Sequence, residues 1–399
     1  MMAEGLVVRD PTYAFYAETC FYRTEHFLHD QMRGIAGAKV RAVARWGAHL
    51  DEFPVPALFL AEEFRTPLIR AWNALLRRIS RDRSTPDRLP PHAIRRIARH
   101  LRRHPVDLIY CIFGWNAAQL LDVLDRLERP VPLVFLAGGS DITAASSFAG
   151  DYPRRLGQAC DRAALILCGS RFLADKLRAR GVPEAKLAVH YIGIDLPAPD
   201  ADRADREGRG FRALAVSRLS PVKGVLHTIR AFARVAGAIP DATLEIIGDG
   251  EQRPACAELI EELGLAGRVR LRGSLPLARV YEAMRRSHVF LQHNVRTPEG
   301  REESLGGSIL EASAHRLPVI VTRSGGVPEA VEDGRTGVIV EPGDEDAMAT
   351  ALLELARDPG RRERLGTAGR ALVERTFDLR EQNRRLGQTL HRVYAESLR

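Results

Sequence analysis

Two cations stand in a short loop of this sequence where they could hold a phosphate group. Arg218 and Lys223 lie in SRLSPVKG (217–224), which follows the β-rich run RALAVS (212–217) and precedes a helical stretch. We therefore expect both side chains at the carboxyl edge of a strand. Two positive charges there can neutralise a diphosphate and the charge that develops on it as a leaving group. Taken alone, the pattern also fits a solvated loop.

Two carboxylates follow in GREESLGGSILEASAHRLPVIVT (300–322), with Glu303 in a polar loop and Glu311 about one turn into a helix. That helix is expected to begin near Gly306 and Gly307. Its free backbone N–H groups and its dipole favour a phosphate or an electron-rich sugar. A loop carboxylate can accept hydrogen bonds from sugar hydroxyls, and a helix carboxylate can hold a ribose diol. A mere surface role for Glu311 is disfavoured by its apolar neighbours.

A glycine pair forms the third candidate. Gly325 and Gly326 follow the β-rich run LPVIVT (317–322), and Val327-Pro328-Glu329 opens a helix. Adjacent glycines allow a positive φ or a close approach of the backbone to a ligand. Pro328 stands in the first helical turn, where proline is tolerated. A plain strand–helix turn would show the same pattern.

The elements that position these residues alternate along the chain. Short β-rich runs are separated by stretches with apolar residues at helical spacing, which predicts βαβ units and parallel sheets covered on both faces. The runs are VDLIYCIF (106–113), PLVFLA (132–137), ALILCGS (164–170), RALAVS (212–217), ATLEIIG (242–248), RVRLRG (268–273), SHVFLQ (287–292), LPVIVT (317–322) and TGVIVE (336–341).

A polar segment without periodicity, PAPDADRADREGRG (197–210), separates two such groups and is predicted to be a linker. We expect an α/β protein with two Rossmann-like, doubly wound domains facing across a cleft. The first covers residues 1–198 and the second 209–375, and a helix over 376–399 packs back toward the first. Ligands of such folds bind at the carboxyl edges of the strands.

Composition limits the partners. The chain has 399 residues, 45% hydrophobic and 28% charged, with a formal charge of +8, which suits two globular domains and anionic ligands. Its five scattered cysteines form no CxxC pair and suit a reducing compartment. The N-terminal residues lack the features of a secretory signal, and no long apolar run is present. We expect a cytoplasmic protein, soluble or peripheral on the inner face of the membrane.

The segment 70–103 is rich in arginine and ends in a helical pattern. It fits either a solvated helix face or a basic amphipathic helix that rests on an acidic membrane surface. Nucleic acid is not an expected partner, because no pattern of stacking aromatics and no zinc-finger spacing accompanies the basic residues.

Taken in order, these motifs resemble the donor half of retaining family-four glycosyltransferases with the GT-B fold. The family pattern is a strand followed by RLxxxKG, a GdG-type turn, EGxPxxxLEA, PVVaT and GGxPEvvxdGxtG. This chain has Arg218-Leu219 with Lys223-Gly224, then Gly248-Asp249-Gly250, Glu303-Ser304-Leu305-Gly306 through Leu310-Glu311-Ala312, Pro318 through Thr322, and Gly325 through Glu329. VFLQHN followed by PEGREES also resembles a subgroup that makes bacterial exopolysaccharides. The first half matches more loosely, through AETCFYR (17–23), IFGWNA (112–117), GGSDIT (138–143), CGSRFLADKL (168–177) and YIGIDL (191–196).

The resemblance implies a nucleoside-diphosphate sugar as co-substrate and no cofactor. Arg218 and Lys223 would bind the diphosphate, Glu311 the ribose hydroxyls and Glu303 the transferred sugar, with Arg218, Lys223 and Glu303 as the catalytic set. No metal is expected, since the two cations take its place. The implied donor-binding set is Arg218, Lys223, Gly248, Glu303, Leu305, Gly306, Gly307, Ser308, Glu311, Gly325 and Gly326.

Two departures from the family pattern matter. In the EGxP loop, Ser304 replaces a glycine and Gly306 replaces a proline, so we expect a less rigid loop. In the first domain, Gly138 stands where many relatives have a histidine, and the HxHFG-like segment reads YCIFG (110–114). No acceptor-side base can therefore be named, and a retaining mechanism in which the leaving phosphate takes the acceptor proton needs none. Asp141 and Glu18 are candidate acceptor-side groups, with a structural capping role as the alternative for each.

The predicted function is transfer of a hexose to a hydroxyl of a glycan or lipid-linked glycan in cell-surface polysaccharide biosynthesis. Two alternatives share the fold. A sugar-nucleotide epimerase needs the same diphosphate site but no acceptor. A degenerate transferase would act as a binding partner in a polysaccharide-assembly complex, as the missing histidine and the altered loop allow.

Overall fold

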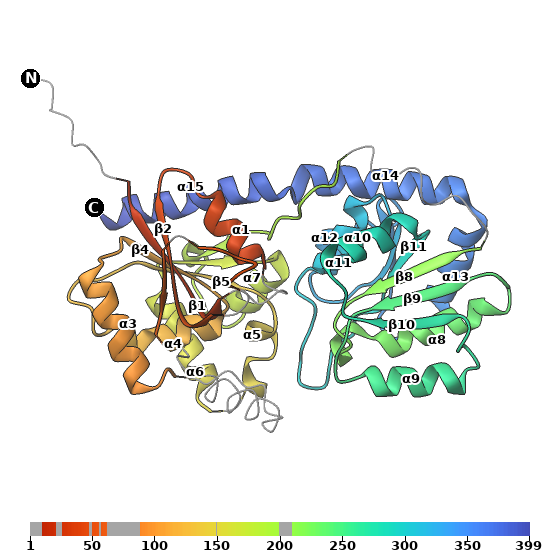
Figure 1. Cartoon of the computed structure of the whole chain (residues 1–399), viewed down its shortest axis with the longest axis horizontal. Helices are drawn as coiled ribbons and strands as arrows, with labels where there is room; N and C mark the ends of the chain where they lie inside the picture. Colours follow the sequence, from red (N-terminus) through yellow and green to blue (C-terminus); the bar gives the residue numbers. More distant parts are fainter. Residues whose placement is uncertain are drawn as a thin grey trace, which may run out of the picture. The chain divides into compact units, whose positions relative to one another are not determined.

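The computed structural model describes residues 10–20, 26–47, 50–55, 57–61, 88–148, 150–198 and 210–399. The chain divides into two compact units (Figure 1). The first comprises residues 1–169, 174–190 and 382–399, and the second comprises 170–173 and 191–381. Most of the predicted linker, residues 199–209, lies outside the described residues.

The first unit holds a seven-stranded parallel sheet in the order β3-β2-β1-β4-β5-β6-β7. Its strands are β1 (Thr12–Cys20), β2 (Lys39–Gly47), β3 (Leu58–Leu60), β4 (Leu108–Ile112), β5 (Leu133–Ala137), β6 (Leu165–Cys168) and β7 (Leu187–Val189). Its helices are α1 (His26–Gly34), α3 (Pro91–Arg103), α4 (Gly114–Leu124), α5 (Ser140–Thr143), α6 (Tyr152–Arg162) and α7 (Arg171–Arg178). All residues of the central strands β4, β5 and β6 are buried, as expected where helices cover both faces of a parallel sheet.

The second unit holds a six-stranded parallel sheet in the order β10-β9-β8-β11-β12-β13. Its strands are β8 (Arg212–Val216), β9 (Thr243–Ile247), β10 (Val269–Gly273), β11 (Val289–Gln292), β12 (Val319–Thr322) and β13 (Gly337–Val340). Its helices are α8 (Val225–Ala236), α9 (Arg253–Glu262), α10 (Leu277–Arg286), α11 (Gly307–Ala314), α12 (Val327–Ala330), α13 (Glu345–Arg357) and α14 (Pro359–Thr376), and α15 (Leu379–Ser397) follows. Each of these strands falls within a run that the sequence predicted.

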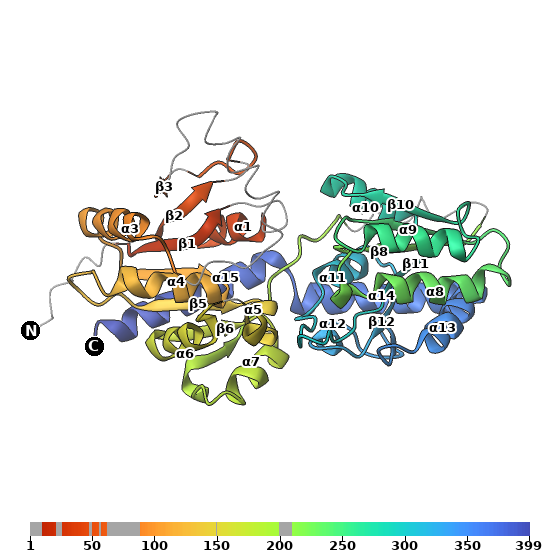
Figure 2. The same cartoon turned by 90° about the horizontal axis from the view of Figure 1, so that it is seen from below.

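Each face of the second sheet carries its own apolar core. Along β8, Ala213 and Ala215 pack with α8, α9 and α13 on one face. Leu214, between them in the chain, packs with α10, α11 and α14 on the other. Figures 1 and 2 show these helices as two layers around the sheet. Successive side chains of each strand point to opposite faces of the sheet, and each helix packs one line of apolar residues against it. The sheet is thus covered by helices on both faces, as predicted.

Two boundaries of the units differ from those predicted. Residues 191–198, assigned from the sequence to the first domain, group with the second unit. The Ile194 N–H donates to the Phe377 carbonyl (2.7 Å), and the Ile194 carbonyl accepts from the Leu379 N–H (3.1 Å). The first turn of α7 also groups there, because Glu329 accepts hydrogen bonds from the N–H groups of Arg171 and Phe172, each at 2.8 Å.

Residues 382–399, most of α15, group with the first unit. The Tyr13 hydroxyl on β1 lies 2.7 Å from Nδ1 of His391, and the Asn383 amide donates to the Asp30 carbonyl at 3.1 Å. The C-terminal helix therefore completes the cover of the first sheet, on the same face as α1 (Figure 1).

Candidate functional site

The candidate site lies at the carboxyl edge of the second sheet. The chain builds β8, β9 and β10 outward in one direction and then returns to place β11 beside β8. The loops after β8 and β11 therefore diverge at a topological switch point, which is where open parallel sheets bind ligands. Arg218 and Lys223 lie in the loop after β8, and Glu303 lies in the segment between β11 and α11.

The loop that carries the two cations is fixed by its neighbours. A short 3-10 turn, Pro221–Lys223, ends at Gly224, where an added Cβ would clash with the His293 carbonyl after β11. Asn294 reinforces this contact by donating from its amide to the Val222 carbonyl at 3.3 Å. Gly248 and Gly250 lie against the carbonyls of Ser217 and Leu219 on the other side. The GDG turn thus seats the backbone that carries Arg218, whose side chain is exposed.

Lys223 and Glu303 form an ion pair that is largely withdrawn from solvent. Their side chains keep only 16% and 11% of their surface exposed. The Glu303 carboxylate also accepts from the Asn294 amide at 3.1 Å and from the Ser304 N–H at 3.2 Å. Burial by itself raises the pKa of Glu303, but Lys223, the Ser304 N–H and Arg218 lower it, and the net pKa lies below the ordinary value. Glu303 is therefore ionised at neutral pH.

The glycine pair after β12 holds the backbone of Glu303 in place. Gly326 N–H donates to the Glu303 carbonyl at 2.9 Å. A Cβ on Gly325 would clash with the Glu303 carbonyl, and one on Gly326 would clash with the Ser304 carbonyl. Gly325 also has φ +56°, a conformation that side chains disfavour. The two glycines are thus required because the loop after β12 passes directly over the backbone of Glu303 and Ser304.

The helix α11 begins where the sequence predicted, at Gly307. Gly306 precedes it with φ +93°, which proline cannot adopt, so a proline at this position would require a different path of the loop. Leu305 is buried, and the Ser308 hydroxyl donates to Gln292 at 2.9 Å. Glu311 is half-buried one turn into the helix, between the buried residues Leu310 and Ala312.

Two site residues escaped the sequence reasoning. Asn294 bridges the loops after β8 and β11 by binding both Val222 and Glu303. Gln292, the last residue of β11, holds the Asn294 side chain (2.8 Å) and accepts from Ser308. A polar QHN triplet directly after the apolar VFL is the sequence feature that could have indicated them, since strand ends at this edge carry site residues.

The candidate acceptor-side groups of the first unit are both engaged. Asp141 is fully buried, and its carboxylate accepts from the N–H groups of Gly114 (2.8 Å), Gly138 (3.2 Å) and Gly139 (2.6 Å). Burial raises its pKa against the opposing effect of those hydrogen bonds. This geometry supports the capping role, in which Asp141 ties together the loops after β4 and β5.

Glu18 lies near the end of β1, which is the switch-point strand of the first sheet. Its carboxylate binds the Arg45 guanidinium and the Gln119 amide, each at 3.1 Å, and its side chain is 14% exposed.

Within the described part of the chain, no cluster of three or more histidine, cysteine or acidic side chains could hold a metal ion. No helix among the described residues is long and apolar enough to cross a membrane.

Comparison with known protein families matches both halves of the chain. Residues 28–197 match glycosyltransferase family 4, and residues 201–372 match the glycosyl transferases group 1. A GDP-mannose-dependent alpha-(1-6)-phosphatidylinositol monomannoside mannosyltransferase of Mycolicibacterium smegmatis is 34% identical over 59% of this chain and 64% of its own length. The putative colanic acid biosynthesis glycosyltransferase WcaL of Salmonella typhimurium is 28% identical over 70% of this chain and 68% of its own.

Solved structures show the same fold. HepE of Anabaena in complex with UDP-glucose superposes with a TM-score of 0.74 at 21% identity, over 96% of this chain and 99% of that one. WaaG, a glycosyltransferase involved in lipopolysaccharide biosynthesis, gives 0.67 at 16% identity, over 94% and 99%. The two doubly wound units therefore form a glycosyltransferase fold of the GT-B type. The chain belongs to the family-four glycosyltransferases, as its motifs indicated.

Proposed function

We propose that this protein is a metal-independent, retaining hexosyltransferase of cell-surface polysaccharide or glycolipid biosynthesis. It would move a hexose from a nucleoside-diphosphate sugar to a hydroxyl of a glycan or lipid-linked glycan. The observation that carries the proposal is the withdrawn Lys223–Glu303 ion pair at the switch point, with the exposed Arg218 on the same loop. The families matched by the two halves and the names of the relatives support the same class of reaction.

The diphosphate would exchange places with the Glu303 carboxylate as the partner of Lys223. A diphosphate carries more charge than one carboxylate and can bind Lys223 and Arg218 together, so the exchange is favourable. Both cations would then stabilise the negative charge that develops on the leaving phosphate, as a divalent metal ion does in other enzymes. Because the protein already supplies these charges, we propose that transfer requires no metal.

Glu303, once released from Lys223, would accept hydrogen bonds from hydroxyls of the transferred sugar. As a carboxylate, Glu303 can only accept hydrogen bonds, which suits it to sugar hydroxyls. The Asn294 amide and the Ser304 N–H still bind the carboxylate, so it keeps its position. The N–H groups at the start of α11, at Gly307 and Ser308, favour an electron-rich group nearby. Glu311, half-buried in that helix, would bind the ribose diol.

The acceptor proton would go to the leaving phosphate. In a retaining step, the bond from the anomeric carbon to the phosphate oxygen breaks, and the bond to the acceptor oxygen forms on the same face. The acceptor proton moves to the departing phosphate oxygen, which completes the balance. The engagement of Asp141 and Glu18 in other contacts supports this route, since neither carboxylate is left to serve as a base.

The basic segment offers a route to an acidic membrane surface. Residues 70–87 lie outside the described residues, but α3 is described. Its apolar residues Ala93, Ile94, Ile97, Ala98 and Leu101 are buried in the unit, so α3 cannot insert an apolar face into lipid. The outward arginines Arg95, Arg96, Arg99, Arg102 and Arg103 could bind anionic headgroups by charge alone. We propose that the protein works at the cytoplasmic face in this way, with salt-sensitive attachment.

A transfer assay with labelled nucleotide sugars tests the function. Wild-type protein and the variants Lys223→Ala and Glu311→Gln are incubated with UDP- and GDP-hexoses and a membrane extract as acceptor source, with and without EDTA. We expect a labelled glycoside with the original anomeric configuration from the wild type, unchanged by EDTA, and a loss of at least about a hundredfold in the variants. Lys39→Ala, an exposed lysine on β2, is the matched control.

Other products would contradict the proposal. An epimerised nucleotide sugar without any glycoside would indicate an epimerase. Binding of a nucleotide sugar without turnover across acceptors would indicate a degenerate partner protein. Full activity of either variant would reject the assigned site.

A further inference from the structure

Three aromatic side chains gather at the carboxyl edge of the first sheet, where the mechanism above uses none of them. Phe113 directly follows β4, Trp115 is the second residue of α4, and Phe148 follows the short turn Ala145–Ser147. The ring centroids of Phe113 and Trp115 are 4.5 Å apart, and those of Trp115 and Phe148 are 5.9 Å apart. All three side chains are half-buried, so part of each ring remains accessible. We call these three residues the aromatic platform.

The Phe113 ring of the platform occupies the space that a side chain at residue 138 would need. Phe113 has φ +66°, an unfavourable conformation for a bulky residue. This conformation places its ring directly on Gly138 after β5, where an added Cβ would clash with the ring. Strained backbone persists where the surroundings enforce it and is frequent at binding sites.

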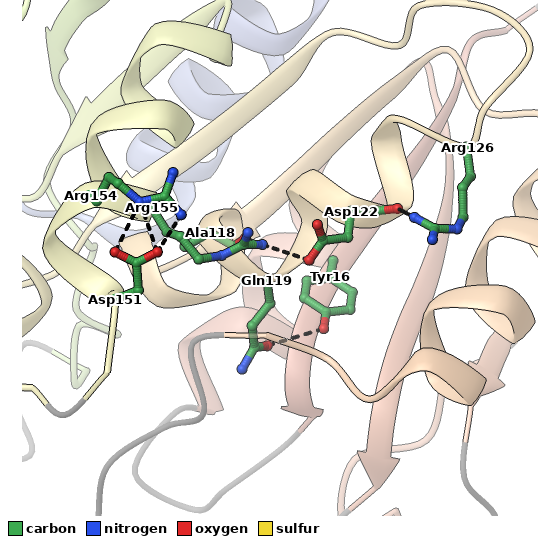
Figure 3. Close-up of polar contacts among 8 residues, drawn as sticks. All are labelled: Tyr16, Ala118, Gln119, Asp122, Arg126, Asp151, Arg154 and Arg155. Carbon is green, nitrogen blue, oxygen red and sulfur yellow. Dashed lines mark hydrogen bonds and ion pairs between the residues drawn. The ribbon is translucent and has the colours of Figure 1, made fainter.

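The platform rests on a rigid base. Figure 3 shows Arg155 of α6, only 3% exposed, reaching across to α4, where it donates to the Ala118 carbonyl (2.6 Å) and to Asp122 (2.9 Å). Phe148 packs edge-on against Tyr152 of α6, with ring centroids 5.1 Å apart. The helix that carries Trp115 and the segment that carries Phe148 therefore both pack on α6. A rigid platform loses little conformational entropy when a ligand binds.

Polar groups lie beside the platform. Asn116, next to Trp115, accepts a hydrogen bond from the Glu18 N–H at 3.0 Å. The Glu18 carboxylate is held by Arg45 and by Gln119, which also accepts from the Tyr16 hydroxyl (Figure 3). The edge therefore presents flat apolar faces next to a paired carboxylate and guanidinium.

We infer that the aromatic platform is a subsite for a sugar ring of the acceptor. A pyranose has one face of C–H groups, which packs on an aromatic ring, and a rim of hydroxyls, which can bind Glu18 and Arg45 without breaking their pair. A lipid chain would bury that ion pair without offering hydrogen bonds, which is unfavourable. The inference rests on the proposed function for the role of the sugar as acceptor, but the binding site itself lies wholly in the first unit.

Tryptophan-selective NMR tests the inference directly. The chain has three tryptophans, so isotope labelling of their indole N–H groups gives few signals, and Trp115→Phe identifies that of Trp115. The full-length protein is titrated with methyl α-glucoside, methyl α-mannoside and methyl α-galactoside, and with octyl phosphate as the lipid-like probe. We expect at least one glycoside to shift the Trp115 signal saturably, and octyl phosphate to leave it unchanged.

Variants separate a binding role from a structural one. Trp115→Ala and Phe148→Ala should each weaken glycoside binding roughly threefold to tenfold, as loss of one ring contact predicts. Binding to Trp115→Ala, which lacks the indole signal, is followed by saturation-transfer NMR of the glycoside. Phe59→Ala is the matched control, because Phe59 is a half-buried aromatic of the same unit that stacks on His100 at 3.9 Å. Wild-type affinity in both platform variants, a Trp115 shift with octyl phosphate only, or no shift with any glycoside would overturn the inference.

Nucleotide-sugar binding, followed separately by calorimetry, distinguishes this failure from failure of the proposed function. Donor binding without any glycoside shift rejects the platform alone. A glycoside shift without donor binding supports the sugar subsite and rejects the proposed transferase.

Discussion

Removing the Lys223 ammonium while keeping its length, as in Lys223→Met, should destabilise the second unit in a way that depends on pH. The Glu303 carboxylate would remain largely buried without its counter-charge. Loss of one partner of a fully buried ion pair costs about 3–5 kcal/mol. Here the two side chains keep 16% and 11% of their surface, and Asn294 and the Ser304 N–H still bind the carboxylate. We therefore expect about 2–3 kcal/mol at neutral pH, below that range.

The pH dependence follows from the pKa of Glu303. In the wild type this pKa is lowered below 4.5, so the pair contributes stability above the unfolded value, which is lost as the pH falls through the folded pKa. In Lys223→Met, burial acts without its main opponent, and the pKa should rise above 4.5. The variant then regains stability on acidification, because Glu303 becomes neutral. The loss relative to wild type should be largest near pH 7 and should shrink toward about pH 5.

Urea unfolding of wild type, Lys223→Met, Glu303→Gln and the double variant at the two pH values measures these quantities. The double variant should lose at least about 1 kcal/mol less than the sum of the single losses, because the two residues interact directly. The exposed Lys39→Met should stay within about 0.5 kcal/mol of wild type. Additive losses, or a loss in Lys223→Met that is the same at both pH values, would refute the assignment of a coupled, withdrawn pair.

Three further predictions concern packing and protonation. Gly326→Ala should displace the Glu303 loop and lower stability by about 1–3 kcal/mol together with nucleotide binding, whereas Gly237→Ala, whose Cβ meets no atom within 4 Å, should be neutral in thermal melts and titrations. Gly138→Ala should lower the free energy of unfolding in urea by about 1–3 kcal/mol, because the added Cβ clashes with the Phe113 ring. Phe113→Ala should remove that clash in the double variant. Wild-type stability of Gly138→Ala would contradict this packing. Burial, and to a lesser extent the neighbouring His227, lowers the pKa of His293 to about 4. The neutral ring therefore contributes its full stability above about pH 6.5, and this contribution is lost as the pH falls toward 4. His293→Gln should flatten the pH–stability curve between these values, and an unchanged slope would contradict a buried neutral ring.

The second unit could be predicted from its sequence almost element by element, because its strands are short apolar runs between strongly periodic helices. The runs 212–217, 242–248 and 287–292 contain β8, β9 and β11. The site residues Arg218, Lys223, Glu303 and Glu311 follow at strand and helix ends, where parallel topology brings them to one edge. What the pattern did not contain is that Lys223 and Glu303 bind each other. Pairing across 80 positions depends on how two loops cross, which no local spacing records.

The first unit was predicted less completely, for physical reasons that its strands show. β1 and β2 lie before the first run identified from the sequence. In β2, KVRAVARWG, Arg41 and Arg45 flank a short apolar centre at residues 42–44, because the strand lies near the sheet edge and only its centre is buried. The role of Asp141 was uncertain from sequence, since a capping carboxylate and an acceptor-side carboxylate look alike until burial and partners are known. The aromatic platform depends on a positive φ at Phe113, and residue type gave no indication of it.

The central claim is that the cations after β8 bind the diphosphate of a nucleotide sugar. Calorimetric titration of wild type, Arg218→Gln, Lys223→Met and the control Lys39→Met with UDP and GDP, in EDTA, tests it most directly. The account predicts that one of the two nucleotides binds to wild type and control alike, and that each site variant weakens this binding at least about tenfold. Equal affinity in all four proteins, or no binding of either nucleotide to the wild type, would contradict it.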